Sequence, residues 1–145
     1  MKVRAAVLAG VALFAGGCGG SEKTLETSTV LATLRAVGLS DLHVRSYGDA
    51  DFIFTGTFGN PALMPMTVTR LESVKSARSR FANDQRLLQG QLSPADRAAL
   101  PRGYDPERLT DVRVCNLVIT SYNSRRDAVL ATRVERAVTA LRAKC

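Results

Sequence analysis

The segment that most constrains the fold is the apolar run from Val112 to Thr120. It contains Val114, Cys115, Leu117, Val118 and Ile119 almost without interruption. A half-exposed strand alternates apolar and polar side chains, whereas a short unbroken apolar run is typical of a strand that is covered on both faces. We therefore expect this run to be a central strand of a sheet, with other elements packed against both of its faces.

Three longer stretches have the apolar periodicity of amphipathic helices. They are Thr24 to Val37, Ser73 to Gln89, and Arg126 to Lys144. Gly38 and Gly90 follow the first two stretches, and glycine is the usual residue just beyond a helix C-terminus. Ser93 and Pro94 predict a short further helix that ends at Leu100, because serine caps a helix and proline suits its first turn.

Three further stretches favour extended structure. Leu42 to Tyr47 and Asp51 to Thr57 are rich in strand-forming residues, and Gly48 between them signals a hairpin turn. Prolines precede and interrupt the third stretch, Met64 to Leu71, so we expect it at the edge of the sheet. The order of elements predicts an α+β domain with a small, mainly antiparallel sheet of three to four strands and about three helices packed on it.

The first 17 residues have the three-part layout of an export signal. Lys2 and Arg4 precede an uncharged apolar stretch from Ala5 to Ala15, and small residues follow it. The apolar stretch is shorter than the roughly 20 residues that a transmembrane helix needs. We therefore expect a cleaved leader at residues 1–17, a short tether at 18–23 and a single folded domain at 24–145.

Ala15-Gly16-Gly17-Cys18 resembles the lipobox of bacterial lipoproteins, in which small residues precede a cysteine. The resemblance implies that Cys18 receives a diacylglyceryl thioether and that the leader is cut before it. It also implies a lipid-anchored protein on the extracytoplasmic side of a cell membrane or in the cell envelope. The chain has Ala15 where the commonest form of the motif has leucine. An ordinary secretory signal, cleaved at the same bond, is the alternative.

The cysteine count bears on this choice. The chain has three cysteines, and an odd number in an exported protein leaves one thiol to explain. Acylation of Cys18 would leave Cys115 and Cys145 as an even pair in an oxidising compartment, where a disulfide is expected. We predict this disulfide, with the two Cα atoms within about 7 Å of each other. The cysteines lack the close paired spacing of a zinc site, so no metal is predicted.

Few residues suggest catalysis. His43 is the only histidine, so any histidine-dependent base or catalytic triad would have to use it. Asp49 and Asp51 flank the predicted turn and could supply a mechanism that uses carboxylates alone, although acids beside turns usually serve the turn. The sequence contains neither a G-x-S-x-G elbow nor a glycine-rich phosphate loop. It therefore predicts no cofactor and no defined catalytic set.

Composition and charge favour some partners over others. Tryptophan is absent and aromatic residues make up 6%, which disfavours a platform for stacking sugars. The formal charge is +7, and a moderate basic excess of this kind most often lies on the solvated outer faces of helices and serves solubility. On a short tether the same residues would favour anionic lipid headgroups or an envelope protein over nucleic acid. Our leading interpretation is a membrane-anchored binding or structural module of the cell envelope. The alternative is a small exported enzyme that uses acidic residues or His43.

Overall fold

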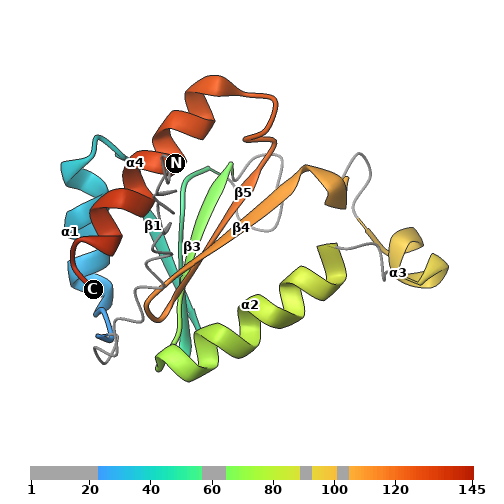
Figure 1. Ribbon diagram of the computed structural model, residues 1–145, viewed down its shortest axis with the longest axis horizontal. Coiled ribbons are helices and arrows are strands. Elements are labelled where there is room, and N and C mark those ends of the chain that lie inside the picture. Colours follow the sequence, from blue (N-terminus) through green and yellow to red (C-terminus); the bar gives the residue numbers. More distant parts are fainter. Residues whose placement is uncertain (1–22, 57–64, 89–92, 101–104) are drawn as a thin grey trace, which may run out of the picture.

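The structure is a computed structural model, and it describes residues 23–56, 65–88, 93–100 and 105–145. A five-stranded antiparallel sheet lies between two layers of helices (Figure 1). Helices α1 (Thr27–Ala36) and α4 (Ala128–Arg142) cover one face, and α2 (Val74–Leu88) packs on the other. The predicted α+β class is confirmed, but the sheet has five strands rather than three to four.

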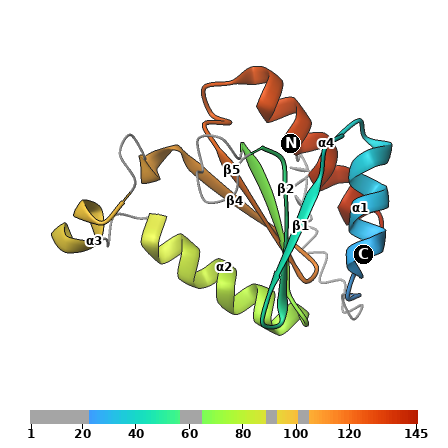
Figure 2. The same ribbon diagram turned by 180° about the vertical axis from the view of Figure 1, so that it is seen from behind.

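The strand order places two strands at the edges of the sheet. The strands are β1 (His43–Tyr47), β2 (Ala50–Phe54), β3 (Met66–Arg70), β4 (Leu109–Val114) and β5 (Leu117–Tyr122). Their order across the sheet is β1-β2-β3-β5-β4, and every neighbouring pair is antiparallel. β1 is nearer the viewer in Figure 2 and β4 in Figure 1, so the two edges lie on opposite sides of the domain.

The apolar run that we expected to be one central strand is a hairpin. β4 ends at Val114, β5 begins at Leu117, and Cys115 and Asn116 form the turn between them. Both turn residues are buried, with Asn116 0% and Cys115 4% exposed, so no exposed polar residue interrupts the run. Cys115 has a φ of 52°, which a residue other than glycine rarely adopts. Of the two strands in this apolar run, β5 lies inside the sheet and β4 lies at its edge.

The expectation of a sheet edge between Met64 and Leu71 is also wrong. β3 covers Met66–Arg70 and lies at the centre, between β2 and β5. Pro65 does not interfere, because it precedes the strand, and Pro61 lies outside the described residues. The Pro65 carbonyl oxygen accepts a hydrogen bond of 3.0 Å from the Tyr122 backbone N–H, which needs no donor from the proline.

Two apolar cores hold the layers together. The main core lies between the sheet and helices α1 and α4, and its completely buried side chains include Val30, Leu34, Val68, Leu117 and Leu141. The second core lies under α2 and is smaller, with Ala50, Leu71, Ala77 and Val118. Since Ala77 is the one buried residue of α2, this helix buries fewer side chains against the sheet than α1 and α4 do.

Side-chain caps explain where two helices begin. The Asp127 carboxylate accepts hydrogen bonds of 3.0 Å from the backbone N–H groups of Val129 and Leu130, and α4 starts there. Ser93 and Asp96 form a reciprocal capping box at the start of α3 (Pro94–Ala98), as the sequence indicated. α3 buries no residue, and a single 3-10 turn, η1 (Pro106–Arg108), leads into β4.

Candidate functional site

The residues that the sequence offered for catalysis do not converge. His43 lies on the exposed edge strand β1, where its Nε2 is 3.3 Å from the Asp41 carboxylate and its ring is 5.7 Å from that of Phe54. Asp51 lies on β2 beside α1, on the opposite face of the sheet from Phe54. Asp49 is exposed in the turn between the two strands. A mechanism in which His43 and Asp51 share a substrate has no geometric basis here.

Asp51 belongs to a polar network that fixes the start of α1. Its carboxylate accepts hydrogen bonds from the Ser46 hydroxyl at 2.6 Å and from the Thr27 hydroxyl, and Arg70 lies 3.7 Å away. The hydrogen bond from Ser46, followed by that from Thr27 and the charge of Arg70, lowers the pKa of Asp51 against the opposing effect of burial. Arg70 also donates to the Leu25 carbonyl oxygen at 3.2 Å. These partners give Asp51 a structural role.

Asn116 makes the corresponding connection at the hairpin turn. Its side-chain oxygen accepts from the Leu25 N–H at 2.7 Å, and its side-chain nitrogen donates to the carbonyl oxygens of Leu25 at 3.1 Å and Leu71 at 2.6 Å. The side chain thus joins the segment before α1 to the segment after β3. Sequence analysis did not single out Asn116, although a polar residue inside an apolar run was a signal for a turn.

Cys115, the other residue of this turn, lies at disulfide distance from Cys145. The two Cα atoms are 6.1 Å apart, within the limit that we predicted, and the pair connects the turn to Cys145, three residues after the end of α4. Cys115 lies in a turn, however, and not in a central strand as we expected. Figure 1 shows the C-terminus beside the start of α1, so several segments meet here. We call this region of Leu25, Asp51, Cys115, Asn116 and Cys145 the tied end.

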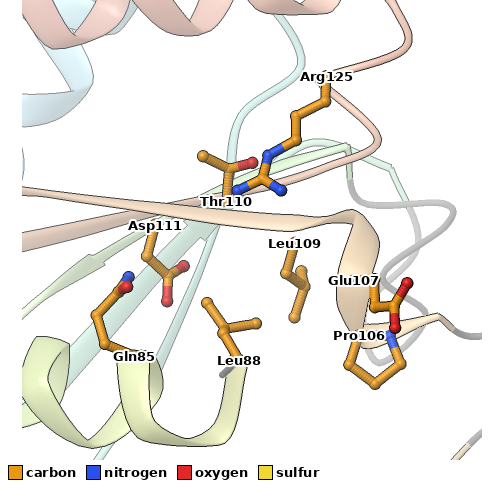
Figure 3. Close-up of a pocket in the computed structure, with 8 residues that line it drawn as sticks. All are labelled: Gln85, Leu88, Pro106, Glu107, Leu109, Thr110, Asp111 and Arg125. Carbon is orange, nitrogen blue, oxygen red and sulfur yellow. The ribbon is translucent and has the colours of Figure 1, made fainter. Parts of the chain in front are cut away.

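A cavity of about 510 Å³ lies at the other end of the hairpin, and we call it the edge hollow. Helix α2, η1, β4 and the loop after β5 contribute its lining residues, which are Gln85, Leu88, Pro106, Glu107, Leu109, Thr110, Asp111 and Arg125. Figure 3 shows Asp111 on one side of the β4 ribbon and Thr110 and Arg125 on the other, so the hollow wraps around the edge of the sheet. Sequence analysis identified none of these residues as a site.

The Asp111 carboxylate is the most chemically distinctive group in the edge hollow. The Thr120 side chain, opposite it on β5, hydrogen-bonds to the carboxylate, but Asp111 Oδ1 is buried without a partner among the described residues. Burial raises the pKa of Asp111, with a further increase from nearby Asp84, while Thr120 and Arg80 act in the opposite direction. Arg80 is engaged elsewhere, because its Nε donates to both Asp84 oxygens at 3.0 and 2.9 Å.

This arrangement can bind a hydrogen-bond donor, and a cationic donor above all. An unpaired carboxylate oxygen is costly to bury, so a ligand that donates to Asp111 would recover that cost. Glu107 adds a second acidic side chain to the lining. In the described part of the chain, no group of three or more His, Cys, Asp or Glu side chains lies close enough together to hold a metal ion.

A second cavity, of about 310 Å³, adjoins the opposite face of β4. We call it the α4 hollow, and its lining residues are Val112, Ser124, Ala131, Val134, Glu135, Val138 and Arg142. Most of the lining comes from α4 and is apolar, with Glu135 and Arg142 as its charged members. β4 therefore has a hollow on each of its faces.

Comparison of the chain with models of known protein families, with curated proteins and with solved structures found no match. Within the described ranges, no helix combines the length and the apolar character that a membrane-spanning helix needs. Cys18 and the leader lie outside the described residues. The assignment of a function therefore depends on the sequence signals and the geometry above.

Proposed function

We propose that this chain is an exported lipoprotein, anchored through Cys18, whose folded domain is a binding module of the cell envelope. The observation that supports the anchor best is the approach of Cys115 to Cys145, with Cα atoms 6.1 Å apart. That pair accounts for two of the three cysteines and leaves Cys18 for acylation. The small residues before Cys18 suit the same modification.

The geometry of the domain is compatible with this anchor. Residues 18–23 can extend over at most about 20 Å, so the folded part would stay close to the bilayer. Leu25, the first residue hydrogen-bonded to the hairpin, lies at the tied end. Asp111 lies about 16 Å from Asn116 along β4, at about 3.3 Å per residue. An anchor at the tied end would therefore leave the edge hollow facing away from the attachment point.

Two kinds of partner follow from this arrangement. Anionic headgroups would contact basic side chains of the domain, each contributing about 1 kcal/mol close to an anionic surface. An envelope protein would occupy the hollows beside β4. We favour the protein partner, because the acidic side chains of Asp111 and Glu107 would repel an anionic headgroup from the edge hollow.

Metabolic labelling tests the anchor directly. Cells that express the chain are grown with an alkyne-tagged fatty acid, and labelling and membrane retention are compared for the wild type, Cys18→Ser and the matched control Ser21→Ala. We expect label in the wild type and in Ser21→Ala, and neither label nor retention in Cys18→Ser. Recovery of the wild type as an unlabelled, released protein would reject the anchor and favour ordinary secretion.

A further inference from the structure

The outer side of β4 has backbone groups that pair with no other strand of the described residues. In the described part of the chain, β4 pairs with β5 and no other strand. Val114 and Leu117 flank the two-residue turn, so they form a hydrogen-bonded pair, as does every second pair along the ladder. The bond of 2.8 Å from Asn123 N–H to the Arg108 carbonyl oxygen follows this alternation. The backbone N–H and C=O groups of Asp111 accordingly point outward.

The hollows adjoin this edge on both faces of the sheet. Side chains alternate along β4, so Leu109 and Asp111 face α2 while Thr110 and Val112 face α4. An added strand would alternate in the same way, and its successive side chains would enter the edge hollow and the α4 hollow in turn. Pairing through the backbone with pockets for alternate side chains is a general way to bind an extended peptide.

The other edge strand, β1, lacks this combination. All five of its residues are exposed, and neither hollow includes a residue of β1. The hollows therefore distinguish β4 as the edge suited to receive a partner.

We propose that β4 takes up an extended segment of an envelope protein as a sixth strand, with a lysine or arginine opposite Asp111. The basic side chain would enter the edge hollow that Asp111 and Glu107 line, and a rotation of the Asp111 carboxylate would bring its buried Oδ1 to this donor. Across the edge, Arg125 favours an acidic neighbour in the segment, and Val112 and Val134 favour an apolar one. This proposal rests on the proposed role as a binding module and does not depend on the lipid anchor.

Peptide selection tests the proposal with the full chain. Protein purified in detergent from whole cells and their medium is used to select from a displayed library of random peptides of about ten residues, enough for one strand. We expect selected peptides to carry a lysine or arginine within an alternating, strand-forming pattern, and to shift the amide NMR signals of Leu109 and Asp111. Asp111→Asn should weaken their binding by about tenfold or more, and the control Asp49→Asn should leave it unchanged.

The backbone contribution is tested separately. N-methylation of alternate peptide amides along the pairing edge should abolish binding, whereas methylation along the other edge should not. Failure to select any peptide, equal binding by both methylated forms, or signal shifts at Val44 and Ser46 of β1 instead would overturn the proposal.

Fatty-acid labelling of the same preparation separates this proposal from the anchor. Labelled protein that selects no peptide rejects strand addition and leaves the anchor supported. Unlabelled protein that binds peptides along β4 rejects the anchor and supports strand addition.

Discussion

The polar groups at the two ends of the β4–β5 hairpin differ in whether they have hydrogen-bond partners. At the tied end, the Asn116 amide makes three hydrogen bonds and the Asp51 carboxylate has two hydroxyl donors and a nearby arginine. We call the other end, around Asp111 and Asn123, the open end. There, Asp111 Oδ1 and Asn123 Oδ1 are buried without a hydrogen-bond partner among the described residues.

The contrast separates groups that stabilise the fold from groups that are available to a ligand. Satisfied buried polar groups add to stability and fix one arrangement, whereas an unsatisfied one costs free energy until something binds it. Asp51 and Asp111 illustrate the difference, because their pKa values are shifted in opposite directions. Substitutions at the tied end should therefore destabilise the protein, and substitutions at the open end should affect binding.

The largest effect is expected at Asn116. Asn116→Ala would leave the Leu25 N–H and the Leu71 carbonyl oxygen without the Asn116 side chain as partner, and the Leu25 carbonyl oxygen would keep only its bond from Arg70. It would also open a cavity at a residue that is 0% exposed. We expect the free energy of unfolding to fall by about 3 kcal/mol or more in urea denaturation. The matched control at the open end, Gln85→Ala, should change it by less than about 0.5 kcal/mol. An equal loss of unfolding free energy in the two variants would contradict the predicted difference between the tied end and the open end.

The next effect concerns the cysteine pair at the tied end. Cys145→Ala removes a cross-link between residues 30 apart in the sequence, and we expect the oxidised protein to lose about 3 kcal/mol of stability. A reducing agent should destabilise the wild type by a similar amount and leave Cys145→Ala unchanged. Cys18→Ser is the control, since it should retain the response to the reducing agent. Free thiols at Cys115 and Cys145 in exported protein would contradict the prediction.

Asp51 should have a smaller and pH-dependent effect. Asp51→Asn removes the charge that Ser46, Thr27 and Arg70 stabilise, and we expect a loss of about 1 to 2 kcal/mol at neutral pH. Because folding lowers the pKa of Asp51, its stabilisation is complete above the unfolded value of 3.8 and is lost as the pH falls through the lower folded pKa. Denaturation curves for the wild type and the variant should therefore converge in acid. A difference that persists at the lowest pH would assign the effect to packing.

Asp111 should show the smallest effect on stability, with the opposite sign. Burial raises the pKa of Asp111, so its charged form costs free energy in the folded protein. We expect Asp111→Asn to stabilise the protein by about 1 kcal/mol at neutral pH. The gain should be complete above the raised folded pKa and should disappear as the pH falls towards the unfolded value of 3.8. Destabilisation at neutral pH would show that Asp111 supports the fold instead.

Local signals in the sequence predicted several elements correctly. Apolar periodicity located α1, α2 and α4, and Gly48 located the turn between β1 and β2. The cysteine count predicted that Cys115 would approach Cys145. These predictions worked because helix periodicity, turn residues and thiol parity are properties of short segments or of composition.

The sequence predicted neither the boundary between β4 and β5 nor the candidate site. A turn is usually recognised by exposed polar residues, but the turn at Cys115 and Asn116 is buried and contacts Leu25 before α1, Leu71 after β3, and Cys145. Asp51 was a candidate catalytic residue because it flanks a turn. Asp111 was not a candidate, because it lies just before the apolar run that begins at Val112. Their environments depend on residues far away in the sequence.

The α+β class, the three packed helices and the approach of two cysteines could be predicted from the sequence, because each of these depends on local pattern or on count. The bonds that Asp51 makes with Thr27 and Arg70, from two other elements, depend instead on tertiary packing, as does the lack of a partner for one Asp111 carboxylate oxygen among the described residues. The physical reason is that hydrogen bonding and desolvation act through space, so the state of a carboxylate depends on which distant segments pack around it.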